Sequence, residues 1–188
     1  ALEVLEAMET MTGNAVNQAL WDVTVALGAE ALVLGGLASD EEDGADQVDE
    51  ALTSGRAAEV FGRMVAALGG PGDFVDRYPD RLPAARVVRD VPAPRAGFVR
   101  KIDAEALGHA VVHLGGGRLK GGDRINPSVG LSDMMPIGEP LAAGETIARI
   151  HAASDAGAEA ALAAVIAAYR IGDEDPEEPP LIHDRIVA

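Results

Sequence analysis

The sequence changes its pattern near residue 80, and this change constrains the fold more than any other feature. Before it, apolar residues recur at helical spacing and glycines separate the segments. After it, Pro79, Pro83, Pro92 and Pro94 bracket a short apolar run, which is typical of a β-strand. A helical part followed by mixed helices and strands predicts the α/β (α+β) class, with an internal boundary near residue 80.

Capping residues and periodicity place the individual elements. Four helices are expected before the boundary, at 2–12, 19–34, about 40–53 and 56–68. After the boundary we expect strands at 85–91, 97–102, 146–151 and 181–187, and helices at 103–114 and 155–171. The remaining segments are expected to be strand-like at 118–137, a turn at 138–144 and an acidic loop at 173–180.

Composition limits both the core and the chemistry. Aromatic residues make up only 3% of the chain, so the core has to be built from Ala, Val, Leu and Ile. There are no cysteines, which excludes disulfides, thiolate metal sites and cysteine nucleophiles.

The charge balance argues against anionic partners. The formal net charge is -16, the only lysines are Lys101 and Lys120, and no cluster of Lys and Arg is evident. Nucleic-acid binding needs a basic surface, and an acidic surface is repelled by anionic membranes. No run approaches the ~20 apolar residues of a membrane span, and Ala1–Glu9 lacks the basic start of a signal peptide. We therefore expect a soluble, cytoplasmic protein that binds neither nucleic acid nor membrane.

His109 and His113 are four residues apart on a predicted helix, the spacing of a zinc-binding pair. The zincin motif also needs a glutamate after the first histidine, and Ala110 stands there. We therefore favour a structural reading, in which one histidine is exposed and the other half-buried.

Three other patterns have structural explanations. The run Gly115-Gly116-Gly117-Arg118 follows a helix, whereas phosphate loops precede one, so helix capping and close packing are favoured. Ser128–Ser132 inverts the nucleophile-elbow motif, and no spacing selects a triad that includes Asp133. The acidic run at 173–178 lacks the alternating pattern of a calcium loop and is expected to be solvated.

Six stretches resemble the thymidine phosphorylase (pyrimidine-nucleoside phosphorylase) family, in the family's order and over nearly the whole chain. They are ALEVLEA at 1–7, WDVTVAL at 21–27, GRAAEVFGRMVAA at 55–67, GFV at 97–99, ALGHAVVHLGGGR at 106–118 and DRINPSVGL at 123–131. A helix also begins at the first residues without a cap, so we expect an N-terminal part of the same enzyme to be missing.

The resemblance implies a pentosyltransferase that cleaves a pyrimidine deoxynucleoside with inorganic phosphate to the base and 2-deoxyribose 1-phosphate. Phosphate is then a co-substrate, and no other cofactor is implied; the parent enzyme is expected to be a homodimer. Residues 1–80 resemble the helical part of the family's large α/β domain. Residues 81–188 resemble its C-terminal α+β subdomain, which has a hammerhead, barrel-like form.

The family's phosphate-binding and base-binding segments have no counterpart in this chain. Lys101 and Lys120 lie outside any such motif, so we expect no catalytic and no substrate-binding residue here. In some relatives a monovalent cation is held partly by a glutamate that matches Glu6. A helix-surface role for Glu6 is favoured, because the other oxygen ligands would come from absent residues.

Two other functions compete with an enzyme portion. The C-terminal subdomain resembles biotinyl and lipoyl carrier modules in form, with Lys120 as the one candidate for modification. A stand-alone interaction domain is the third hypothesis. Neither thymidine nor uridine preference can be predicted, because the base-reading segment is absent.

Overall fold

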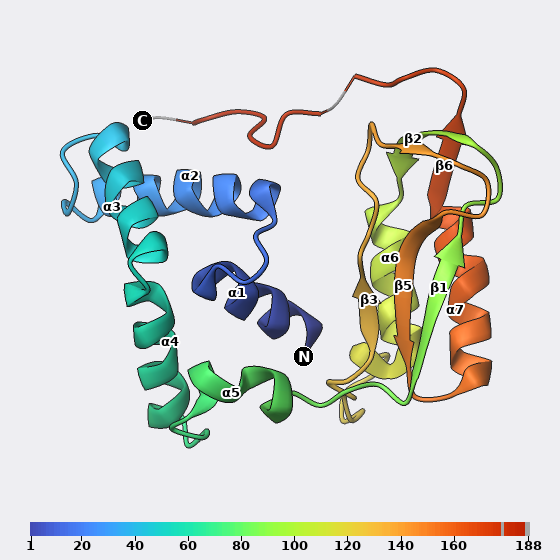
Figure 1. Cartoon of the computed structure of the whole chain (residues 1–188), viewed down its shortest axis with the longest axis horizontal. Helices are drawn as coiled ribbons and strands as arrows, with labels where there is room; N and C mark the ends of the chain where they lie inside the picture. Colours follow the sequence, from blue (N-terminus) through green and yellow to red (C-terminus); the bar gives the residue numbers. More distant parts are fainter. Residues whose placement is uncertain (178, 187–188) are drawn as a thin grey trace. The chain divides into compact units, whose positions relative to one another are not determined.

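The computed structural model describes residues 1–177 and 179–186, and divides the chain into two compact units (Figure 1). One unit consists of Glu3–Leu82 with the C-terminal segment that begins at Pro180. The other consists of Pro83–Pro179 with Ala1–Leu2. The first is helical and the second mixes helices with two small antiparallel sheets, so the predicted α+β class is confirmed.

The described part of the helical unit contains five helices. They are α1 (Leu2–Thr12), α2 (Gln18–Leu34), α3 (Glu41–Thr53), α4 (Arg56–Ala67) and α5 (Phe74–Arg81). The first four match the predicted segments closely, because helical periodicity and the glycines between them are legible in the sequence, and α2 and α3 also have side-chain caps. The Asn17 side chain accepts a hydrogen bond from the backbone N–H of Leu20, and Asp40 accepts one from Asp43.

Helix α5 was not predicted, because its proline was assigned to the boundary of a strand. The helix is kinked at Arg77, which has φ -132°. Pro79 therefore falls in the first turn after the kink, where a missing N–H is tolerated. Phe74 and Tyr78 from this helix form the small core of the unit with Met8 of α1.

The second unit contains strands in two antiparallel sheets. One sheet has the order β1 (Val87–Pro92), β5 (Thr146–Ala152), β3 (Gly130–Ser132). The other has the order β4 (Pro140–Leu141), β2 (Gly97–Ile102), β6 (Tyr169–Gly172). Helices α6 (Ala104–Val111) and α7 (Asp155–Ala168) pack against each other, and α7 also contacts β1 and β5. The core lies between these layers and consists mainly of Val, Ile and Ala, as the composition predicted.

Several predicted bounds after residue 83 are wrong. The helix expected at 155–171 ends at Ala168, because Tyr169–Gly172 pairs with β2 as strand β6. In the strand-like segment 118–137, only Gly130–Ser132 forms a strand, and the predicted turn at 138–144 contains β4. No strand occurs within 181–186; residue 187 of that predicted strand lies outside the described residues.

Candidate functional site

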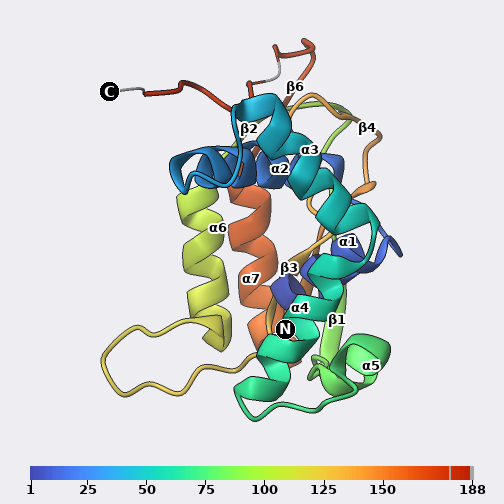
Figure 2. The same cartoon turned by 90° about the vertical axis from the view of Figure 1, so that its left-hand side faces the viewer.

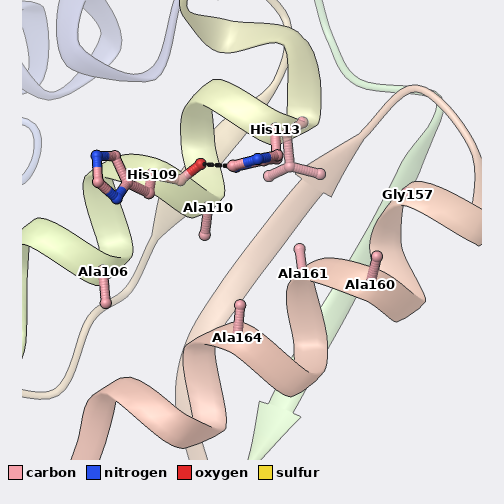
Figure 3. A pocket seen from close by; sticks show the side chains of 9 residues that line it. Ala106, His109, Ala110, His113, Gly157, Ala160, Ala161 and Ala164 are labelled. Carbon is pink, nitrogen blue, oxygen red and sulfur yellow. Dashed lines mark hydrogen bonds between the residues drawn. The ribbon is translucent and has the colours of Figure 1, made fainter. Parts of the chain in front are cut away.

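A groove between α6 and α7 is the first candidate site, and small residues explain why it exists. Ala106 and Ala110 of α6 face Ala161 and Ala164 of α7, and Gly157 lies near the start of α7 (Figure 3). Because none of these side chains extends beyond Cβ, a pocket of about 440 Å³ remains between the helices. Leu114 also lines this pocket, whose surface is mainly apolar.

His109 and His113 lie at the edge of this pocket, and both are exposed. The prediction that one of them would be half-buried is wrong. Helix α6 packs through Leu107 and Ala110, which are 5% exposed, so the two histidines fall outside the contact surface. The His113 Nδ1 atom lies 2.7 Å from the carbonyl oxygen of His109, while the His109 side chain points away from that ring (Figure 3).

The two imidazole rings therefore do not converge on a position where they could bind one metal ion together. No cluster of three or more His, Cys, Asp or Glu side chains that could hold a metal ion occurs among residues 1–177 and 179–186. Chemically, the groove offers an apolar floor with two imidazoles beside it.

A second polar cluster lies on the sheet β1-β5-β3, and the sequence interpretation missed it. The Ser132 Oγ atom lies 2.9 Å from His151 Nε2 and 3.2 Å from Asp133 Oδ2. Arg149 joins the cluster by donating from Nε to Asp90 Oδ1 at 2.8 Å and by pairing with Asp133 at 2.9 Å. Antiparallel register brings these residues together, since Arg149 lies opposite both Asp90 and Ser132.

The geometry of this cluster does not match that of a catalytic triad. In a triad the acid holds the histidine and the histidine activates the serine. Here the nearest acid, Asp133, contacts Ser132 and Arg149 instead. Burial lowers the pKa of His151, the charge of Arg149 lowers it further, and Asp133 opposes both effects. The cluster is thus a hydrogen-bonded network around a histidine whose neutral form is favoured.

Glu6, the predicted cation ligand, lies exposed on α1. Its Oε1 atom accepts a hydrogen bond from Asn17 Nδ2 at 3.1 Å, and Asn17 is the N-cap of α2. This contact ties the middle of α1 to the start of α2. Cation binding by Glu6 stays a prediction.

The glycine run and the lysines have clear positions. Gly115 has φ +98° in a π-helical turn at Val112–Gly116, and a Cβ at Gly116 would lie 2.7 Å from Val111 Cγ1. This close packing confirms the structural reading of the run. Lys101 is exposed on β2. Lys120 lies in the loop between α6 and β3, away from any β-hairpin tip where a carrier lysine would be expected.

The acidic run after β6 is exposed in the part that the structure describes. Asp173 pairs with Arg95, and Glu174 pairs with Arg100 at 2.7 Å. Residue 178 of this run lies outside the described residues. No helix among the described residues is long and apolar enough to cross a membrane.

Comparison with known proteins identifies the class of the α+β unit. Residues 98–172, which run from β2 through β6, match the family model of the pyrimidine nucleoside phosphorylase C-terminal domain. The chain is also 47% identical, over 186 residues, to proteins named thymidine phosphorylase from Burkholderia cenocepacia (strain HI2424) and Burkholderia orbicola (strain AU 1054). The chain is thus similar to the C-terminal part of proteins named thymidine phosphorylase, which confirms the resemblance read from the sequence.

The same alignments show how much of each relative's length corresponds to this chain. The alignments include 99% of this chain and 42% of the length of each relative. The chain therefore spans less than half of the curated relatives it matches.

Proposed function

We propose that the chain is the C-terminal portion of a phosphorylase that cleaves thymidine with inorganic phosphate, giving thymine and 2-deoxyribose 1-phosphate. The observation that carries this proposal is the 47% identity to proteins named thymidine phosphorylase over almost the whole chain. In this proposal residues 1–80 contribute helices to the large α/β domain, and residues 81–188 form the C-terminal subdomain. The parent enzyme is cytoplasmic and a homodimer.

The helical unit carries apolar residues that support packing against the remainder of such an enzyme. Leu27 and Leu34, seven residues apart on α2, are 62% and 86% exposed. Val60, Met64 and Leu68 follow one another at four-residue spacing along α4 and its end, and all are exposed. Large exposed apolar side chains that share a helix face are typical of an interaction surface.

We further propose that the chain alone does not catalyse phosphorolysis. The reaction needs cationic groups that hold phosphate and stabilise charge on the departing base. The pocket between α6 and α7 offers mainly apolar surface, and the network around His151 has no acid in the orienting position. Loss of one charge-stabilising donor typically reduces the rate by ~10²–10³-fold, and in this proposal the whole set lies elsewhere in the parent.

The test compares purified residues 1–188 with the full-length parent in a thymidine phosphorolysis assay. The parent should release thymine, whereas the chain alone should show no release above a mock purification from the same host. A parent that cleaves neither thymidine nor uridine would contradict the assigned reaction. Release by the chain alone, at a rate near that of the parent, would place the catalytic residues within this chain.

A further inference from the structure

The loop between the π-helical turn and β3 gathers cations that have no acidic partner. Arg118, Lys120 and Arg124 are all exposed, and none forms an ion pair with another residue in 1–177 or 179–186. Elsewhere many arginines are paired, as Arg149 is with Asp90 and Asp133. The sequence interpretation recognised no Lys and Arg cluster. The ion pairs of the described residues leave these three positive charges available to a ligand, although the net charge of the chain is -16.

Hydrogen bonds to the Asp123 side chain fold the backbone of this loop into a turn. Asp123 Oδ2 accepts hydrogen bonds from the backbone N–H groups of Leu119 and Lys120, at 3.2 and 3.1 Å. This turn holds the backbone of residues 119 and 120 against the Asp123 side chain, within the seven-residue segment that carries Arg118, Lys120 and Arg124. The one carboxylate of the loop is already engaged by backbone donors.

Both ends of the loop are fixed, and its tip is open. The Asn126 N–H donates to the Gly115 carbonyl at 2.8 Å, which closes the base of the loop. At the tip, a Cβ added to Gly121 or Gly122 would meet no atom within 4 Å. Their N–H groups donate no hydrogen bond recorded within the described part of the chain. Figure 2 shows this loop, drawn in yellow, as an excursion beyond the end of α6.

We propose that the loop at 117–126 binds the phosphate group of a small molecule, either free phosphate or a phosphate monoester. Three exposed cations within seven residues, beside tip N–H groups that donate no recorded hydrogen bond, supply the charge and the donors that suit a tetrahedral dianion. Charges farther than about 8 Å from the loop are largely screened at physiological ionic strength, so the net charge of -16 does not by itself exclude local phosphate binding. Binding at this loop uses no residue that the proposed phosphorolysis needs, so the proposal does not depend on the proposed function.

The experiment is a titration of the full chain followed by amide NMR, at constant ionic strength maintained with sodium chloride. Inorganic phosphate, a pentose phosphate and the unphosphorylated pentose are added separately. Saturable shifts are expected at the amides of 118–124 with both phosphate compounds and not with the pentose. Full binding by inorganic phosphate would identify the free ion as sufficient, and binding by the pentose phosphate alone would identify the ester; both support the proposal.

Substitution separates a site from general charge attraction. The variant R118Q/K120Q/R124Q should raise the half-saturating phosphate concentration by at least about tenfold. The matched control R56Q/R63Q removes two exposed arginines of α4 that have no ion pair among the described residues, and it should bind like the unchanged chain. R118K/R124K keeps the charge and should retain most of the binding.

Three results would overturn the proposal. These are the absence of saturable shifts at 118–124, equal shifts with chloride alone, and unchanged binding by the triple variant. A dispersed NMR spectrum of each variant verifies folding, and because the loop lies outside every helix and strand, its side chains can be changed without disturbing the core.

Discussion

At the scale of single residues, the surroundings of His151 are set by the pairing of strands and could not be predicted from its neighbours in the sequence. Nineteen residues separate it from Ser132, yet Ser132 Oγ and His151 Nε2 are 2.9 Å apart. The half-buried imidazole lies near one cation, Arg149, and one anion, Asp133. Because burial and Arg149 both disfavour the imidazolium, the folded state holds His151 in its neutral form more strongly than the unfolded chain does.

Stability should therefore depend on pH through His151. Its folded-state pKa lies below the ordinary value of 6.5, so the unfolded chain gains a proton first as the pH falls. Neutral His151 contributes fully to the stability of the folded state above pH 6.5. This contribution decreases as the pH falls from 6.5 toward the folded-state pKa. Between about pH 7.5 and about pH 5.5 the urea midpoint should fall less for His151→Gln than for the unchanged chain.

His109→Gln is the control for this measurement, because it removes an exposed histidine from α6. The control should retain the pH dependence of the unchanged chain. Equal pH dependence in all three proteins would show that the environment of His151 does not favour its neutral form.

The residues of the two candidate sites could be predicted to lie together only where they belong to the same helix or strand. His109 and His113 were correctly placed on one helix from their spacing, but their exposure depends on how α6 meets α7, which spacing does not determine. The network around His151 requires the pairing of β3 with β5 and of β1 with β5. Those pairings are long-range, and a three-residue strand such as β3 leaves little periodic signal.

At the scale of elements, helices with side-chain caps were predicted well and strands with few residues were not. The end of α7 shows why. Periodicity continues to residue 171, but Tyr169 is buried and its hydroxyl donates to the Met135 carbonyl at 3.2 Å. Burial raises the pKa of Tyr169 to about 12, so this donor keeps its proton at neutral pH. Tertiary pairing with β2 thus outweighs the local helical preference of this segment.

The crossing of α2 and α3 gives a sharp test of packing. A Cβ at Gly44 would lie 2.9 Å from both Cα and O of Ala29, so the two backbones approach closely there. Gly44→Ala should lower the free energy of unfolding by about 1–3 kcal/mol, because neither backbone can move independently. The measurement is urea denaturation followed by circular dichroism.

Gly108→Ala is the matched substitution on α6, where an added Cβ meets nothing within 4 Å. It should raise the free energy of unfolding by about 0.5–1 kcal/mol, since alanine favours a helix over glycine. If both substitutions had the same sign, close approach at Gly44 would not explain the result.

At the scale of the whole molecule, the two units have cores of very different size. The α+β unit has a continuous core that includes fully buried Val91, Val99, Ile147, Ile150 and Val165. In the helical unit only Met8, Phe74 and Tyr78 form a buried hydrophobic cluster among the described residues. Buried apolar area is the main source of folding free energy, so the two units should differ in stability.

We predict that hydrogen exchange will resolve two groups of amides. Those in α2–α4 should exchange through an opening of lower free energy than those in β1, β2, β5 and α7. The boundary should fall near residues 80–83. Uniform protection across both groups, measured in the full chain, would show instead that the molecule unfolds as one cooperative unit.

Neither unit is one continuous stretch of chain, and this has a practical consequence for dividing the protein. Ala1 and Leu2 belong to the α+β unit, where a Cβ added to Gly130 would lie 3.0 Å from Leu2 Cδ1. Arg185 pairs with Glu30 and Glu41, within the helical unit. A cut between Leu82 and Pro83 would therefore leave each piece holding a short segment that belongs to the other's fold. Such pieces would behave as complementary halves of a split protein, and an expression boundary chosen from residue 83 alone would remove an anchor from each unit.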